Sequence, residues 1–317
     1  MDAFSDVLRV IRLTGGVFLE AEFTSPWCIK GKISADDCKP FLVTARHVIA
    51  SHFVTAGRMW LRVDGGDTID VHAGELVLLP HNDPHTFGSD LSAALVPASQ
   101  VIQSPQGGGI ARIKYGGGGE PTQVLCGFLG CETPFSPLLS SLPRVLKLDL
   151  RATASGAWIE SSFRFATSEI AAGRLGSTTV IAKLSELLFV EAVSQFVASI
   201  PAERRGWLAG LRDPNIGCAL TLLHARLTQA WTAESLALEV GMSRSAFAER
   251  FTSLVGQPPM QYLALWRMHV AAQQLREGRG SVAQIAFAVG YESEAAFSRA
   301  FKRQFGTSPG IWRRQPA

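Results

Sequence analysis

Several features that would assign this protein to a class at once are missing from its sequence. No run of about eighteen uninterrupted apolar residues occurs, which excludes a helical membrane span. The first residues, with Asp2 and Asp6, contain no apolar stretch ending at a small-residue cleavage site, so we expect a cytoplasmic protein. The five cysteines are odd in number and scattered, which does not suit a disulfide framework. A P-loop, a Gly-x-Ser-x-Gly element and a Cys-x-x-Cys pair are also lacking, and no cofactor is expected.

The length and the charge distribution indicate a protein of two parts. A chain of 317 residues is long for one hydrophobic core, so two domains are the natural expectation. The net charge is only +3, but residues 213–317 hold 11 Lys and Arg against 7 Asp and Glu, whereas the remaining residues hold 19 and 20. The basic excess therefore lies at the C-terminal end, as a nucleic-acid contact requires.

That C-terminal end contains one sequence pattern twice. The same spacing from Phe to Phe to Gly to Pro occurs in Phe247, Phe251, Gly256 and Pro259 and in Phe297, Phe301, Gly306 and Pro309. In each copy a Val-Gly pair precedes a serine, Ser243 or Ser293, that suits the N-cap of a helix. A Gly between two short helices is typical of a helix-turn-helix, so we predict two such units. The Phe pair fixes each second helix against its support, which leaves the opposite face free to enter the major groove.

The free face of each second helix follows by subtraction. It comprises Arg244, Ser245, Ala248, Glu249 and Arg250 in the first copy, and Glu294, Ala295, Ser298, Arg299, Lys302 and Arg303 in the second. We predict that Arg299 binds guanine through two hydrogen bonds and that Lys302 and Arg303 bind phosphates. Glu249 either accepts a hydrogen bond from a cytosine amino group or pairs with Arg244 or Arg250.

The repeated segment resembles the DNA-binding domain of the AraC/XylS family of bacterial transcription regulators. The residues that carry the resemblance are "WTAESLALEVGMSRSAFAERFTSLVGQPPMQYLALWRMHVAAQQL" and "SVAQIAFAVGYESEAAFSRAFKRQFGTSPGIWRR", within about 214–314. The resemblance implies seven helices, two recognition helices in successive major grooves, and residues 261–275 as a rigid connector in which Arg267 matches a usual basic position. Glu249 stands where the family often has Gln or Arg, so the second unit is the stronger candidate for base reading.

The N-terminal half has a different periodicity. Residues 17–100 contain short runs with a period of two, bounded by Gly, Asp or Pro, which predicts a small antiparallel sandwich or barrel. Residues 157–172 and 178–199 are predicted to be helices, and the second is either buried in its own domain or paired with a second copy of the chain. "FLVTARHVIASHFVTAGRMWLRVDGGDTIDVHAGELVLLPHNDPH" and "VLCGFLGCETPFSPLLSSLPRVLKL" resemble the cupin-like sensor of many AraC-type regulators. This implies a β-barrel with an effector pocket, followed by helices that dimerise.

Histidines in the N-terminal half raise the question of a metal site. The candidate ligands are His47, His52, His81, His85 and Glu75. His47 and His52, five residues apart on one strand, point to opposite faces, so the ligand set is incomplete and no metal is expected. We predict instead that His52, His85 and Cys126 line an effector site, with ordinary hydrogen-bonded histidines as the alternative. Cys126 and Cys131 suggest a thiol switch, although they too are five residues apart on a strand.

Together these patterns predict an α+β multidomain protein. We expect a cupin-like antiparallel β-barrel with a helical dimerisation segment over residues 1–200, a linker over 201–213, and an all-α double helix-turn-helix over 214–317. The predicted function is that of a sequence-specific DNA-binding transcription regulator, not an enzyme, controlled by a small-molecule or redox signal. The alternative is a metal-dependent cupin enzyme tethered to a DNA-binding domain. The expected partners are double-stranded DNA, a second copy of the chain, an unidentified effector and RNA polymerase, without a membrane.

Overall fold

The chain divides into two compact units, each described here by itself. The computed structural model describes residues 2–11, 13–34, 36–38, 42, 45–103, 110–132, 137–152, 154–171, 176–201 and 205–314. The strand-rich unit comprises Leu13–Pro134 and Leu142–Phe196, and the helical unit comprises Met1–Arg12, Phe135–Ser141 and Val197–Ala317. Whereas the predicted boundaries assign residues 1–200 to one domain, residues 1–12 and 135–141 group with the helical unit.

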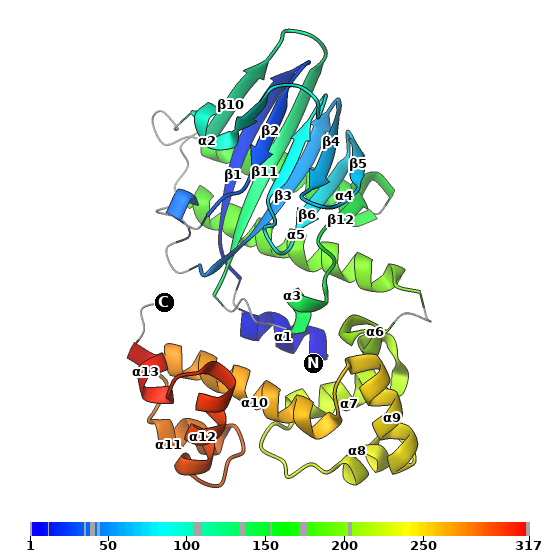
Figure 1. The fold of residues 1–317 in the computed structure, drawn as a ribbon, viewed down its shortest axis with the longest axis vertical. Coiled ribbons are helices and arrows are strands. Elements are labelled where there is room, and N and C mark those ends of the chain that lie inside the picture. Colours follow the sequence, from blue (N-terminus) through cyan, green and yellow to red (C-terminus); the bar gives the residue numbers. More distant parts are fainter. Residues whose placement is uncertain are drawn as a thin grey trace. The chain divides into compact units, whose positions relative to one another are not determined.

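The strand-rich unit contains two sheets built from strands that are distant in sequence (Figure 1). The seven-stranded sheet has the order β12-β6-β3-β11-β1-β10-β9, and the five-stranded sheet has the order β5-β4-β7-β2-β8. The strands are β1 Leu13–Thr24, β2 Cys28–Gly31, β3 His47–Ala56, β4 Arg58–Val63, β5 Thr68–His72, β6 Glu75–Leu79, β7 His85–Gly88, β8 Leu95–Pro97, β9 Ile102–Gln103, β10 Ala111–Gly116, β11 Pro121–Cys131 and β12 Leu146–Asp149. Neighbouring strands are antiparallel, except that β10 runs parallel to β1 and β8 runs parallel to β2.

The prediction of a strand-rich, cupin-like domain is thus confirmed, but the prediction of a β-barrel is not. Within the described residues the two sheets remain separate and form no single closed barrel. Aromatic side chains from both sheets fill the core: Phe23 of β1 stacks on Trp27 at 3.9 Å between ring centroids, and Phe87 of β7 meets both rings edge-on at 6.2 and 5.9 Å. All three are at most 2% exposed, so their burial contributes strongly to the stability of the sandwich.

Two long helices, α4 (Ala154–Ala171) and α5 (Ser177–Ser199), cover the seven-stranded sheet and confirm the two predicted helices. Phe163 of α4 meets Phe18 of β1 edge-on, with ring centroids 4.9 Å apart. A Cβ atom at Gly16 would lie 2.3 Å from Ser185 Oγ, so the small residue lets α5 approach β1 closely. The side of α5 that carries Leu188 is therefore buried within the chain.

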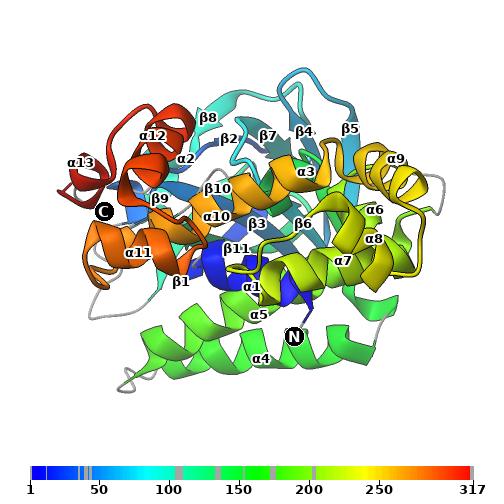
Figure 2. The ribbon, with the colours of Figure 1, turned by 90° about the horizontal axis from the view of Figure 1, so that it is seen from below.

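The helical unit is organised around the connector helix α10, Pro259–Arg276 (Figure 2). Seven helices lie between Pro214 and Arg314, as the resemblance implies: α7 Pro214–Ala225, α8 Ala233–Glu239, α9 Arg244–Val255, α10, α11 Val282–Ala288, α12 Glu294–Phe305 and α13 Pro309–Arg314. Three further helices join them, namely α1 Ala3–Ile11, α3 Pro137–Ser141 and α6 Trp207–Arg212. The first contacts α7 and α10, and the second contacts α6, which explains their place in this unit.

The remaining short elements are the helix α2 (Ala98–Val101) and two single 3₁₀ turns, Asp36–Cys38 and Leu150–Ala152. No helix in the described part of the chain has the length and apolarity that a membrane crossing needs.

Candidate nucleic-acid interface and sensing site

The first helix-turn-helix consists of α8 and α9. The Thr232 hydroxyl accepts from the backbone N–H of Ser235 at 3.0 Å, and the Ser235 hydroxyl accepts from that of Thr232 at 2.9 Å, which closes a capping box on α8. Gly241 in the turn has φ +69°, a left-handed conformation that favours glycine. The Ser243 hydroxyl caps α9, and Gly256 ends α9 with φ +86°. The predicted turn and caps of this unit are confirmed.

The second helix-turn-helix, α11 and α12, repeats these devices one by one. Ser281 and Gln284 form the capping box of α11, with hydrogen bonds of 3.2 and 2.7 Å. Gly290 has φ +82° in the turn, Ser293 caps α12, and Gly306 ends it with φ +76°. The two copies therefore share the backbone conformation that aims their second helices.

The repeated Phe pairs fix α9 and α12 against their supports. Phe247, Phe251, Phe297 and Phe301 are all 0% exposed. The ring centroids lie 5.6 Å apart at 59° in the first pair and 5.5 Å apart at 53° in the second. Because one side of each helix is buried in this way, its other side is turned to solvent.

The connector α10 also fixes the loop that follows α7. Arg267 donates from Nε to the Leu227 carbonyl at 2.9 Å and from Nη2 to the Gln229 carbonyl at 3.0 Å. A Cβ atom at Gly290 would lie 2.8 Å from Arg267 Nη2 and 3.1 Å from the Leu227 carbonyl oxygen. Arg267 thus connects α10, the loop after α7 and the turn at Gly290. It is the basic position that the resemblance to the family singles out, and its contacts here lie within the helical unit.

On α9, most of the predicted contact residues are exposed. Arg244, Ser245, Glu249 and Arg250 lie at the surface, and Ala248 is half-buried. Arg250 donates from Nε to the Asp213 carboxylate at 2.8 Å. Glu249 forms no ion pair with any described residue, so neither of its predicted intrahelical pairs is present in that part of the chain.

On α12, the exposed face is more basic. Glu294, Ala295, Arg299, Lys302 and Arg303 are exposed, and Ser298 is half-buried. Three of these side chains are basic and one is acidic. Arg299 and Lys302 form no ion pair within the described part of the chain, so their charges face solvent. The helices α9 and α12 lie near opposite ends of α10 (Figure 1), as expected for readers of two separate stretches of one nucleic acid.

In the strand-rich unit, His52, His85 and Cys126 lie together in the core. They are 2%, 2% and 3% exposed. His52 Nδ1 lies 3.1 Å from Cys126 Sγ on the neighbouring strand β11, and His52 Nε2 lies 2.8 Å from His85 Nε2 on β7 of the other sheet. His85 Nδ1 lies 2.9 Å from the Asp83 carbonyl oxygen. The structure therefore brings all three predicted effector-site residues into one hydrogen-bonded chain, which links the two sheets.

The carbonyl at the end of this chain fixes where its protons lie. Because a carbonyl only accepts, His85 donates from Nδ1, and its Nε2 then accepts from His52 Nε2. His52 Nδ1 in turn accepts from the Cys126 thiol. Burial lowers the pKa of His52 and His85 and raises the pKa of Cys126 to about 12, so all three groups are neutral at pH 7. No donor in the chain is left without an acceptor.

The other candidate metal ligands point elsewhere. His47 Nε2 lies 2.6 Å from the Pro80 carbonyl oxygen, and His81 Nε2 lies 3.0 Å from the Leu142 carbonyl oxygen. Only His52 and His85 converge, and no group of three His, Cys, Asp or Glu side chains in the described residues is arranged to hold a metal ion. The residues present do not fit the ligand set of a metal cupin.

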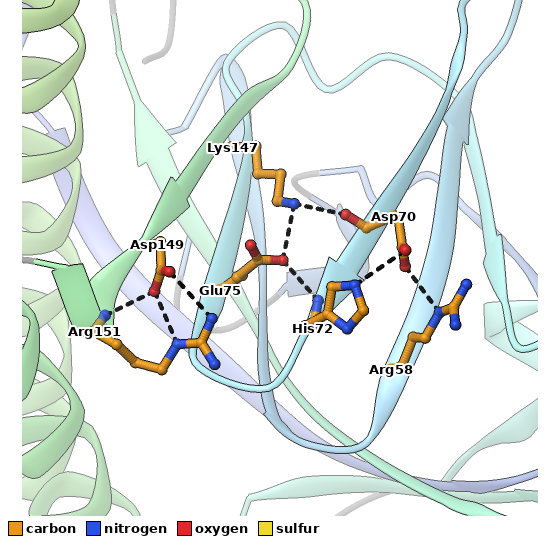
Figure 3. Close-up of polar contacts among 7 residues, drawn as sticks. All are labelled: Arg58, Asp70, His72, Glu75, Lys147, Asp149 and Arg151. Atoms are coloured by element: carbon orange, nitrogen blue, oxygen red, sulfur yellow. Dashed lines mark hydrogen bonds and ion pairs between the residues drawn. The ribbon is translucent and has the colours of Figure 1, made fainter.

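Glu75, the carboxylate candidate, belongs to a polar network that joins the two sheets (Figure 3). Its Oε2 accepts from the backbone N–H of His72 at 2.7 Å and lies 2.9 Å from Lys147 Nζ. Lys147 also donates to the Asp70 carbonyl oxygen at 2.7 Å, and the Asp70 carboxylate pairs with Arg58. Strands β4 and β5 of one sheet and β6 and β12 of the other are thereby connected, which gives Glu75 a structural role.

The cysteines Cys126 and Cys131 lie on the same strand, β11, and both are buried free thiols. In the pairing of β11 with β3, Cys126 lies opposite His52 and Cys131 lies opposite His47. Their separation of five positions along one strand places them on opposite faces, as the sequence predicts.

Comparisons with known proteins agree with this arrangement. A family model described as "Cupin" matches residues 2–198, and a "Helix-turn-helix domain" model matches residues 236–315. A putative AraC-like transcription regulator from Streptomyces antibioticus is 32% identical over 317 residues, which cover 100% of this chain and 99% of that protein. The chain belongs to the AraC-like transcription regulators.

The chain is similar to other regulators as well. The HTH-type transcriptional regulator AlkR of Acinetobacter baylyi is 30% identical, over 99% of this chain and 100% of that protein. A crystal structure of an AraC-type transcriptional regulator from Chromobacterium violaceum is 28% identical and covers 33% of this chain and 96% of that one, with a TM-score of 0.31. This AraC-like regulator thus has a DNA-binding helix-turn-helix region, which binds double-stranded DNA, and a cupin-like ligand-sensing domain. Its curated relatives are regulators and not enzymes.

Two contacts, one in each unit, were not predicted from the sequence. Asp213 caps α7 by accepting from the backbone N–H groups of Asn215 and Ile216 at 3.1 and 2.9 Å, and it binds Arg250 as well. An Asp directly before Pro214 is a recognisable N-cap signal, but no sequence signal predicts that this Asp also pairs with the distant Arg250. Gly31 is the second case, because a Cβ atom there would lie 2.5 Å from His85 Nε2.

Proposed function

We propose that this AraC-like regulator is a one-component transcription switch, in which a signal received in the strand-rich unit changes how the helical unit binds its DNA. The doubled helix-turn-helix with its two exposed faces carries the proposal. The signal acts by shifting populations between states that bind DNA differently. Such a switch works in the cytoplasm, where bacterial DNA is located, and it acts on RNA polymerase at its target promoters.

The residues proposed to contact DNA are the exposed side chains of α9 and α12. They are Arg244, Ser245, Ala248, Glu249, Arg250, Glu294, Ala295, Ser298, Arg299, Lys302 and Arg303. Arg299 is assigned to base reading, because it is exposed near the middle of α12 and is not used in an ion pair within the described residues. Its guanidinium has the fork geometry that matches the major-groove edge of guanine.

The test is to compare the DNA sequences selected by the wild type and by Arg299→Ala from a random library. We expect the variant to lose about 1–3 kcal/mol on the preferred site and to accept any base at one position. Arg313→Ala, a change of the same type on α13, serves as the matched control and should leave the preference intact. An unchanged preference in Arg299→Ala would remove this residue from the base-reading set.

The sensing site is proposed to be the chain of His52, His85 and Cys126. It is a polar element in an apolar core and spans both sheets, so an effector that replaces one of its hydrogen bonds alters the contact between them. Reporter expression from a target promoter should lose its response to the inducing condition in His85→Gln and Cys126→Ser, while DNA binding persists. Cys131→Ser is the control, and an equal loss of response there would argue against the assignment.

Dimerisation is assigned to the exposed apolar face of α4 and α5. Trp158 and Phe165 on α4 are 54% and 52% exposed, and Val180 and Leu187 on α5 are 40% and 48% exposed. Each pair is seven residues apart, which places its members on one helix face, two turns from each other. Phe165→Glu should convert a dimer to a monomer in analytical ultracentrifugation, whereas Glu160→Gln on the same helix should not; a monomeric wild type would refute the assignment.

A further inference from the structure

The helical unit contains a cavity that the proposed DNA and sensing sites do not use. Its volume is about 590 Å³, within the range of small-molecule sites. Trp207 and Val255 line it from the side of the first helix-turn-helix, and Phe305 and Trp312 line it from the side of the second. Residues of α10 form its floor, so the cavity spans the two halves of the unit.

The aromatic walls present apolar surface, because their polar atoms already have partners. Trp207 Nε1 donates to the Tyr262 hydroxyl at 3.0 Å, and that oxygen lies 2.8 Å from His224 Nε2. Trp312 Nε1 donates to the Ala272 carbonyl at 3.2 Å. The walls are thereby fixed in orientation, as a preformed site requires.

Among the lining polar side chains that form no hydrogen bond with a described residue, His269 is the most buried. It is 5% exposed and lines the cavity, and its ring has no hydrogen-bonding partner among the described residues. Burial lowers the pKa of His269 to about 4, so the ring is neutral at pH 7 and offers one donor and one acceptor. The ring nitrogens of His269 are not among the fully buried polar atoms that lack a partner, so they are accessible from the cavity, where a ligand can take the place of water as their hydrogen-bonding partner.

The lining also defines the charge of a ligand. Among the described residues that line the cavity, none is Asp, Glu, Lys or Arg. A charged ligand would lose its hydration there without gaining a counter-ion, which is strongly unfavourable. A flat apolar ligand gains stacking on the aromatic walls, and one hydroxyl or carbonyl group can form a hydrogen bond with one of the two ring nitrogens of His269.

We propose that this cavity is a second ligand site, which takes an uncharged aromatic small molecule that hydrogen-bonds to His269. Such a ligand contacts the supports of both helix-turn-helix units at once. It therefore acts on the DNA-binding unit directly, in addition to any signal received by His52, His85 and Cys126.

The test is isothermal titration calorimetry of the full chain, without DNA, with 2-naphthol as the probe. We expect saturable binding to the wild type, and binding at least about tenfold weaker for the charged analogue 2-naphthoate. Leu265→Trp, which fills the cavity from α10, should abolish binding, and His269→Phe should weaken it about tenfold through the lost hydrogen bond. Leu238→Trp is the matched control, because Leu238 is 82% exposed on α8 and should bind the probe like the wild type.

A rim variant protects the test against misfolding. Gln304 is exposed at the cavity, so Gln304→Trp narrows the opening without entering the core and should also weaken binding. The absence of saturable binding to the wild type would overturn the proposal, as would equal binding by the wild type, Leu265→Trp and Gln304→Trp. Because no DNA is present, either result is independent of the proposed DNA contacts.

Discussion

The two helix-turn-helix units have the same framework and different surfaces. Capping boxes, turn glycines, serine N-caps, buried Phe pairs and left-handed glycine ends recur at matched positions. The exposed faces differ, because α12 presents three basic side chains, whereas on α9 Arg250 is bound to Asp213 and Glu249 adds a negative charge. The framework residues determine how each helix is held, and the surface residues determine what it binds. A difference confined to the surface predicts unequal roles in binding with similar stabilities.

Substitutions in the Phe pairs should have the largest effect on stability. Phe251→Ala and Phe301→Ala each remove a ring that is fully buried in its own unit. Each should lower the free energy of unfolding by about 3–5 kcal/mol, measured by urea denaturation of the full chain. Similar losses would support equal frameworks, and a loss under about 1 kcal/mol in either variant would contradict its buried position.

Alanine at the turn glycines should destabilise the two helix-turn-helix units to different extents. Gly241→Ala meets open space, so its cost of about 1–2 kcal/mol arises from the left-handed φ alone. Gly290→Ala has the same conformational cost and also forces its Cβ against Arg267 and the Leu227 carbonyl. We expect Gly290→Ala to be the more destabilising by at least about 1 kcal/mol in thermal unfolding. Equal costs would show that Arg267 moves aside freely.

Acid should act on the first half of the helical unit through His224. Burial lowers its pKa to about 3 from 6.5, so the folded state holds it neutral. Below pH 6.5 the unfolded state binds the proton and the folded state does not, so this contribution is complete above pH 6.5 and is lost as the pH falls towards 3. At pH 5 the loss is about 2 kcal/mol for this group. His224→Gln should reduce the dependence of stability on pH over this range, with the contributions of the other buried histidines left in place; an unchanged slope would refute the assignment.

The smallest expected effect compares two basic residues in the DNA complex. Lys302→Ala should weaken binding to all duplexes alike and reduce the salt slope by about 0.9 for one lost phosphate contact. Arg250→Ala should reduce the slope less, because Asp213 already neutralises part of the charge of Arg250; it also removes an ion pair at the start of α7. Fluorescence anisotropy titrations at salt concentrations between about 50 and 200 mM measure the salt slope of each variant. Equal slopes for the two variants would mean that α9 and α12 anchor phosphates equally.

Local signals explain why the helical unit was predictable from the sequence. The positions of Ser243, Gly256 and the Phe pair follow from rules that act within four or five residues, and the structure confirms them. Arg250 and Asp213 are 37 residues apart, and no local rule pairs them. The grouping of His52, His85 and Cys126 was predicted only as a shared site, because their contact depends on how the two sheets face each other. The open sandwich, in place of a barrel, depends on the same long-range packing.

The division of the chain between its two units has a mechanical consequence. The backbone passes from one unit to the other four times, after Arg12, Pro134, Ser141 and Phe196. A single flexible tether transmits almost no torque, whereas several covalent strands restrict the rotations that two bodies can make. The strand β1 begins at Leu13, directly after α1 ends at Ile11, so the chain that connects the two units is short at this crossing. For the same reason, a C-terminal fragment that begins after α5 would lack α1 and α3, two helices that belong to the helical unit.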